Sequence, residues 1–135
     1  MSSVLHHLEI WVEDLAASTA SLGWLLTRLG YVVDSQWADG ISYARDGFYI
    51  VLESGPDAKR QRHDRLAPGL NHLAFHAGTR QAVETLAAQA LDHGFTLMFP
   101  ELHPYAGGPK HYAAYLEDAA GFEIELVAAL TQAEA

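Results

Sequence analysis

The same sequence pattern occurs twice in this chain, and this duplication restricts the fold more than any other feature. Residues 5–11 and 70–76 are short apolar runs, each with a histidine in the third position. A segment with helical spacing follows each run and ends at a glycine, 23 positions after His7 and 22 positions after His72. Two successive copies of one strand–helix unit predict a duplicated fold rather than a solenoid.

Hydrophobic spacing and turn residues extend the pattern to a whole module. Asp14 and Thr79 are suited to cap the two helices, which we expect over residues 15–29 and 80–93. The expected strands are residues 5–11, 31–33, 41–44 and 48–52 in the first copy and residues 70–76, 96–99, 111–116 and 122–127 in the second. The order in each copy is therefore βαβββ.

The length of 135 residues fits one α+β domain (1–135) made of two such modules. We assign them to residues 4–53 and 70–128. The stretch 54–69 contains four of the eight basic residues, two prolines and no apolar period, so we expect an exposed linker there. Half of the residues are hydrophobic, which is enough for a packed core.

Composition excludes several classes of function. A formal net charge of -9 argues against nucleic acid as a partner, because phosphate binding needs a basic surface. The absence of cysteine excludes disulfides, thiolate metal sites and cysteine nucleophiles. No apolar run reaches the roughly 20 residues of a membrane span, and the N-terminus has no signal-peptide pattern. We expect a soluble cytoplasmic protein that binds a small molecule.

Alternation along the strands brings candidate metal ligands to one face. His7 shares a strand face with Glu9 and Trp11, and His72 shares one with His76. The last expected strand carries Glu123 and Glu125 on one face among large apolar residues, where carboxylates need a cation, a partner or water. Imidazole and carboxylate ligands from several strands would suit a divalent metal, and the first copy adds Glu53 at a strand end.

The motifs resemble the vicinal oxygen chelate superfamily, which includes glyoxalase I, fosfomycin and bleomycin resistance proteins and extradiol dioxygenases. They are His-Leu-Glu-Ile-Trp-Val-Glu-Asp-Leu from residue 7, His-Leu-Ala-Phe from residue 72 and Gly-Phe-Glu-Ile-Glu-Leu from residue 121. The resemblance covers about residues 4–128. It implies two βαβββ modules whose mixed sheet curls into a cup around a metal, with helices outside, commonly in a homodimer.

Position by position, the resemblance implies that His7, His72 and Glu125 are metal ligands. Glu53 resembles the fourth ligand of the glyoxalase I branch, which can also act as the base. It lies six residues after its turn glycine, whereas Glu125 lies four after Gly121, so the two copies differ in register there.

Other residues are candidates for lining the pocket. Trp11 and His76 occupy matched positions on the faces that carry the histidines, and we expect Glu123 at solvent or at a subunit contact. Residues 100–112 contain three prolines and two glycines, which indicates an irregular loop beside the site. The members of this loop that we expect to contact a substrate are His103, Tyr105, Lys110, His111 and Tyr112.

Three functions fit these residues best, and a thiol transferase of the fosfomycin-resistance type is a further possibility that no residue singles out. The first is a metal-dependent lyase or isomerase of the glyoxalase type, in which Glu53 or Glu125 moves a proton between adjacent carbons. The second is an Fe(II) dioxygenase of the extradiol type, because two histidines and one glutamate make a facial triad. The third is a metal-free, acidic protein that sequesters a cationic drug. The ligands suit Zn, Ni, Mn, Co and Fe, and the sequence does not name the substrate.

Overall fold

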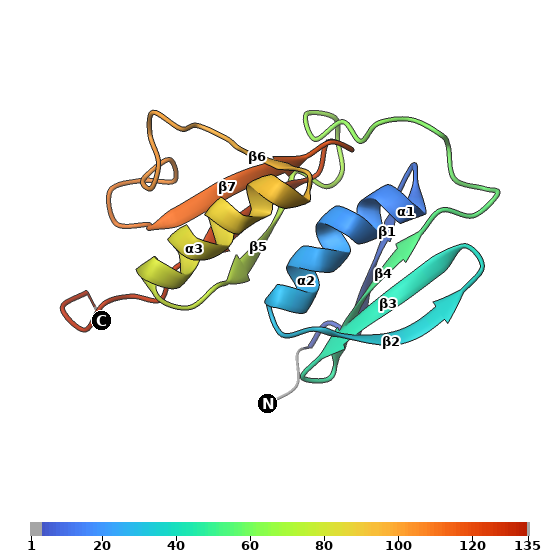
Figure 1. Ribbon diagram of the computed structural model, residues 1–135, viewed down its shortest axis with the longest axis horizontal. Helices are drawn as coiled ribbons and strands as arrows, with labels where there is room; N and C mark the ends of the chain where they lie inside the picture. The colour runs from blue at the N-terminus through green and yellow to red at the C-terminus, as the bar shows by residue number, and fades with distance from the viewer. Residues whose placement is uncertain (1–3, 135) are drawn as a thin grey trace. The chain divides into compact units, whose positions relative to one another are not determined.

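The computed structural model describes residues 4–134 and divides into two compact units, one up to His63 and one from Asp64 onward. Each unit contains a helical segment and a four-stranded mixed sheet (Figure 1). The predicted α+β fold of two βαβββ modules is therefore confirmed. None of the helices in the described residues is long and apolar enough to cross a membrane.

The elements follow the expected order with small changes in their bounds. In the first unit they are β1 (His7–Trp11), α1 (Leu15–Ser18), the π-helical segment η1 (Thr19–Gly23), α2 (Trp24–Arg28), β2 (Val32–Trp37), β3 (Gly40–Arg45) and β4 (Phe48–Glu53). In the second unit they are β5 (His72–His76), α3 (Arg80–Ala90), the 3₁₀ segment η2 (Leu91–His93), β6 (Phe95–Leu97), β7 (Ala113–Asp118) and β8 (Glu123–Val127).

The two sheets have the same topology. Their strand orders are β1-β4-β3-β2 and β5-β8-β7-β6, and in each sheet the first strand lies parallel to the last while the other pairs are antiparallel. A parallel pair cannot be joined by a tight hairpin, so the helix and two strands lie between its members in the chain. Each module therefore brings its histidine-bearing strand beside its last strand.

Local sequence signals explain where the helices begin and end. The side chains of Asp14 and Thr79 accept hydrogen bonds from the amides three residues later, at 3.1 and 3.0 Å. Gly94 ends the second helical segment with a φ of 88°, a left-handed conformation that favours glycine. The predicted caps are thus present in both units.

The most deeply buried large side chains of each unit are apolar residues of its helical segment and its sheet. Leu25, Ile50 and Leu52 are almost fully buried in the first unit, and Leu116 and Ile124 are in the second. The strands that carry the histidines are exposed on one face. In β1 and β5 the histidine face is exposed, while the alternate residues are buried or half-buried. The predicted alternation is confirmed for both strands.

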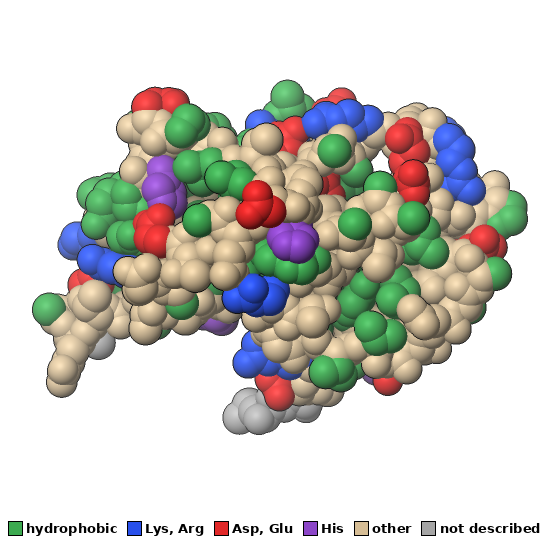
Figure 2. All heavy atoms as spheres, viewed as in Figure 1, with side chains coloured by type: hydrophobic (Ala, Val, Ile, Leu, Met, Phe, Trp, Pro, Cys, Tyr) green, Lys and Arg blue, Asp and Glu red, His purple; other side chains and the backbone are tan. Residues whose placement is uncertain are grey.

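The segment between β4 and β5 is largely exposed, as the sequence predicts. Figure 2 shows basic side chains along the top of the view, where Figure 1 draws this segment. Lys59, Arg60 and Arg62 are exposed, whereas Arg65 is half-buried. Arg65 lies in the second unit and has a role in the candidate site.

Candidate functional site

In the second unit, the parallel pairing of β5 with β8 brings His72 to Glu125. His72 lies opposite Glu123 in the ladder, and Ala74 lies opposite Glu125. The small side chain of Ala74 leaves room on this face, so His72 reaches diagonally across to Glu125. Its Nε2 atom is 3.0 Å from Oε1 of the carboxylate. Two of the four expected ligands are therefore in contact.

The carboxylate of Glu125 is buried and has polar neighbours on both oxygens. Nε2 of His111 contacts its Oε2, and the hydroxyl of Tyr115, which lies opposite in the antiparallel ladder, donates to it. Burial, together with the nearby charge of Glu125, raises the pKa of Tyr115 to about 12. Tyr115 therefore stays a protonated donor at neutral pH, and three side chains contact the buried carboxyl group of Glu125.

Asn71 controls how His72 presents its ring, although the sequence reading did not assign it a role. The Asn71 amide donates from Nδ2 to the backbone carbonyl of Arg65 at 3.0 Å, so its Oδ1 must be the atom that faces Nδ1 of His72, at 2.7 Å. Because Oδ1 can only accept, Nδ1 of His72 must carry a proton. Nε2 then faces Glu125 with either a second proton or a lone pair that a cation would satisfy.

The second carboxylate of β8 is not at solvent. Glu123 is only 5 % exposed, and the guanidinium of Arg65 lies 3.2 Å from its Oε1 and 3.7 Å from Glu117. The expectation of an exposed Glu123 was therefore wrong. Arg65 from the linker covers the residue and supplies the positive charge that a buried carboxylate needs. The same residue holds Asn71 through its carbonyl.

In the first unit, His7 lies on an aromatic neighbour instead of a carboxylate. Its ring stacks on Tyr49, the residue opposite it in the ladder, with 4.8 Å between centroids and 2° between planes. Nδ1 of His7 is 2.9 Å from Nδ1 of His6, so one of these nitrogens carries the shared proton. Where Nδ1 of His7 is the donor, Nε2 of His7 has a lone pair for a ligand. Glu9 accepts a hydrogen bond from the exposed Trp11 at 2.6 Å.

Glu53 does not occupy the position that corresponds to Glu125. In the parallel ladder of the first unit Val51 lies opposite Glu9, as Glu125 lies opposite Ala74 in the second, whereas Glu53 lies opposite Trp11. The register difference noted in the sequence therefore places Val51 at the carboxylate position. Glu53 remains on the His7 face, where Nε1 of Trp37 donates to its Oε1 at 2.9 Å.

Two of the loop residues are tied to helix α3. Nε2 of His103 lies 2.8 Å from Oε1 of Glu84, and the hydroxyl of Tyr112 donates to Oε2. Burial would raise the pKa of Glu84, but the hydrogen bonds from Tyr112 and His103 outweigh it and lower the pKa below its ordinary value. The bond to Glu84, with burial and the carboxylate charge, raises the pKa of Tyr112 to about 12. Tyr105 packs edge-on against Tyr112.

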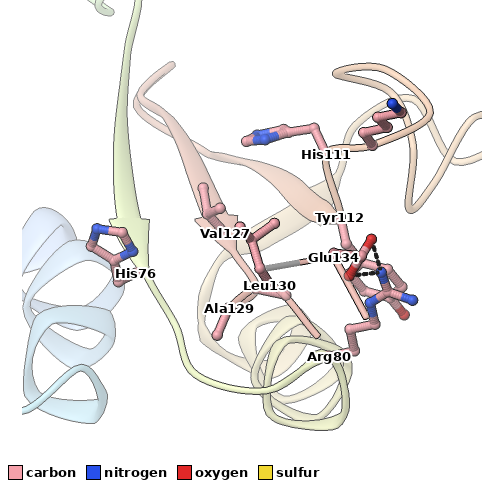
Figure 3. Close-up of a pocket in the computed structure, with 10 residues that line it drawn as sticks. His76, Arg80, His111, Tyr112, Val127, Ala129, Leu130 and Glu134 are labelled. Carbon is pink, nitrogen blue, oxygen red and sulfur yellow. Dashed lines mark hydrogen bonds and ion pairs between the residues drawn. The ribbon is translucent and has the colours of Figure 1, made fainter. Parts of the chain in front are cut away.

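A pocket in the second unit contains several of the expected substrate contacts (Figure 3). His76, Lys110, His111 and Tyr112 line it. Because His111 also contacts Glu125, the pocket adjoins the His72–Glu125 pair. In Figure 3 His76 projects from the end of β5, while Arg80 and Glu134 lie on the other side of the drawn residues.

The donor set of the second unit fits a divalent metal by its chemistry. It offers a fixed imidazole tautomer at His72 and the buried carboxylate of Glu125. His72 and His111 approach different oxygens of Glu125. Within residues 4–134, no group of three or more His, Asp or Glu side chains is arranged around a common point as metal ligands.

The chain belongs to the Glyoxalase/Bleomycin resistance protein/Dioxygenase superfamily, whose sequence profile matches residues 6–115. This superfamily commonly binds divalent metals. The matched range includes both module histidines and ends before Glu125.

Individual relatives agree with this assignment. The uncharacterized protein YqjT of Bacillus subtilis is 38% identical over 125 residues, which are 92% of this chain and 98% of that protein. A crystal structure of a provisionally assigned glyoxalase from Bacillus halodurans is 39% identical, with a TM-score of 0.88 over 94% of this chain and 96% of the other. A glyoxalase/bleomycin resistance protein from Albidiferax ferrireducens shares the fold, with a TM-score of 0.73, 20% identity and coverage of 94% and 99%.

Proposed function

We propose that the chain is a metal-dependent enzyme of the glyoxalase type, which rearranges a small oxygenated substrate at a divalent metal. The contact between Nε2 of His72 and Oε1 of Glu125 carries this proposal, because the Asn71 amide leaves Nε2 free to act as a ligand once a cation replaces the second proton. The similarity to the Bacillus halodurans protein supports the same class. We also propose that the enzyme is a cytoplasmic homodimer.

In this proposal His7, His72 and Glu125 hold the metal. The bound ion would hold two substrate oxygens and stabilise negative charge that develops on them. Glu53 is our candidate for the group that moves a proton between adjacent carbons. Its Oε1 accepts from Trp37, which fixes the carboxylate, and it lies on the same strand face as His7. Tyr115 remains a proton donor beside Glu125.

A second candidate function is an Fe(II) dioxygenase. The observation that favours it is Val51, which takes the position of a carboxylate in the first unit. Two histidines and one glutamate then remain as protein ligands, which is the set of the facial triad with open positions for substrate and oxygen.

Metal content tests the shared part of both candidates. Protein purified without chelator or affinity-tag metal should hold about one divalent ion per chain. His72→Ala should lose this metal and stay folded by circular dichroism, while the matched variant His93→Ala, on the exposed segment η2, should keep it. Unchanged metal in His72→Ala would remove the site. No metal in the native protein, even after Zn²⁺ or Ni²⁺ is added, would favour a drug-sequestering protein.

Glu53→Gln separates the two enzyme candidates. In a glyoxalase-type enzyme this variant should bind metal and lose the exchange of substrate C–H protons with deuterated solvent, followed by NMR on α-hydroxycarbonyl compounds. Full exchange in the variant would remove Glu53 as the base. The native protein is then supplied with Fe(II) and a catechol. Oxygen consumption under these conditions that is unchanged in Glu53→Gln would support the dioxygenase.

A further inference from the structure

The pocket of Figure 3 gathers positive groups in a chain whose net charge is -9. Arg80 and Lys110 line it together with His76 and His111. Within the described residues, no hydrogen bond or ion pair engages Lys110 or His76. Clustered cations with unused donors favour an anionic ligand.

One part of the pocket lining is apolar. Val127 at the end of β8 and the following residues up to Leu130 form this part, and Leu130 is 64% exposed. The pocket volume is about 170 Å³, smaller than the roughly 300–1,000 Å³ of sites for drug-sized ligands. A short aliphatic chain with one acidic end matches this lining in size and in polarity.

A carboxylate of the chain itself already lies against Arg80. Nη2 of Arg80 donates to both oxygens of Glu134, at 2.6 and 2.7 Å, and the amide of Thr131 donates to Oε1 at 2.9 Å. These hydrogen bonds from Thr131 lower the pKa of Glu134, so the group is ionised at neutral pH. Glu134 therefore shows how an anion contacts this part of the pocket.

The contact with Glu134 leaves a donor of Arg80 unused. Nε of Arg80 is buried and has no hydrogen-bond partner among the described residues. A carboxylate that approached the guanidinium from the side would engage Nε and Nη2 together, whereas Glu134 engages Nη2 alone. Both side chains of the pair are about one-third exposed, and such an ion pair contributes little to stability. A ligand can therefore displace Glu134 at small cost.

The guanidinium of Arg80 also contacts an aromatic ring. Cζ of Arg80 lies 4.8 Å from the centroid of the Tyr112 ring, and the Tyr112 hydroxyl is bound to Glu84. This contact with the ring face restricts the motion of the guanidinium.

We propose that this pocket binds a small aliphatic carboxylate. Arg80 and Lys110 bind the acid group. The side chain of Glu134 is an intramolecular competitor for Arg80, and the ligand displaces it. His111 lines the pocket and contacts Glu125, so the acid pocket adjoins the candidate metal ligands. The pocket therefore names a substrate class for the proposed function, and as a substrate site it rests on that function. The binding step itself needs no metal, so it can be tested separately.

The test uses butyrate as the probe and butyramide as its neutral isostere, on the full chain treated with chelator. Methyl shifts of Val127 and Leu130 in NMR titrations should report saturable binding of butyrate and none of butyramide. Arg80→Gln and Lys110→Gln should each weaken butyrate binding by about tenfold or more, while Lys59→Gln, the same charge change on the exposed linker, should not.

Glu134→Ala should strengthen butyrate binding by about threefold or more, because the competing carboxylate is gone. Equal binding of butyrate and butyramide, or equal effects of Arg80→Gln and Lys59→Gln, would overturn the acid site. An unchanged affinity of Glu134→Ala for butyrate would contradict the claim that Glu134 competes with the ligand for Arg80. Butyrate binding by a protein that never binds metal would refute the proposed function and leave this site standing.

Discussion

The two units place a histidine at the same point of the same topology and surround it differently. In the first unit His7 stacks on Tyr49 and shares a proton with His6. In the second, His72 contacts Glu125 and is oriented by Asn71. The backbone frame is repeated, but the polar neighbours of the two imidazoles differ: His6 in the first unit, and Asn71 with Glu125 in the second. The difference teaches that duplication of a fold does not duplicate its chemistry.

Val51 and Glu125 occupy equivalent positions in the parallel ladders of the two units, and they differ in charge. Val51 is 6% exposed and Glu125 is 5% exposed, so both positions are buried. The charged member is tolerated in the second unit because two imidazoles and Tyr115 surround it. In the first unit the position lies opposite Glu9, which would repel a carboxylate.

The largest effect is therefore expected when the first unit is made to copy the second. Val51→Glu should lower the free energy of unfolding by about 3 kcal/mol at pH 7, because a buried carboxylate would face Glu9 without cationic partners. Urea denaturation measures this change. The matched variant Val33→Glu, at an exposed position of β2, should cost little. A stable Val51→Glu protein with tighter Zn²⁺ binding would show that the first unit can also carry a carboxylate ligand.

A smaller effect is expected from the residues that precede the two histidines. Asn71→Ala should weaken Zn²⁺ binding by roughly ten- to a hundredfold, because the ring of His72 loses the acceptor that fixes its tautomer. Titration calorimetry measures the affinity. Asn71→Asp keeps an acceptor oxygen and should restore most of it, and His6→Ala in the first unit should change it less. An Asn71→Ala protein with native affinity would contradict the orienting role.

The smallest effect concerns the loop over residues 100–112, which hydrogen bonds to Glu84 connect to helix α3 in the second unit. Tyr112→Phe should cost about 1 kcal/mol of unfolding free energy near pH 7, because the hydrogen bond to Glu84 is lost. Since the folded pKa of Tyr112 is about 12 against an ordinary 10.0, this stabilisation is complete below pH 10 and disappears as the pH rises through 12.

The lowered pKa of Glu84 sets the acid limit of the same contact. The stabilisation that ionised Glu84 contributes is complete above its ordinary pKa of 4.5. It is lost as the pH falls through the lower pKa that Glu84 has in the folded protein. Denaturation at several pH values compares the native protein with Tyr112→Phe, and Tyr105→Phe at an exposed ring is the control. A difference that is the same at pH 8 and above pH 12 would contradict the hydrogen bond.

The sequence by itself determined the fold because its signals are local and occur twice. Asp14 and Thr79 cap the helices, and alternation along β1 and β5 separates the histidine face from the packed face. These signals depend on neighbours within one turn or one strand, so they can be read without a structure. The irregular loop over residues 100–112 was predicted from its prolines and glycines for the same reason, although β7 begins later than expected, at Ala113.

Only the tertiary structure decided which polar groups meet. The contacts of Asn71 with Arg65, of Arg65 with Glu123 and of His111 with Glu125 join residues from different elements, and no periodicity in the sequence marks them. The exposed position expected for Glu123 was wrong because alternation gives the face of a residue but not what covers that face. Burial and ion pairing depend on long-range packing, which sets the chemistry of the candidate site.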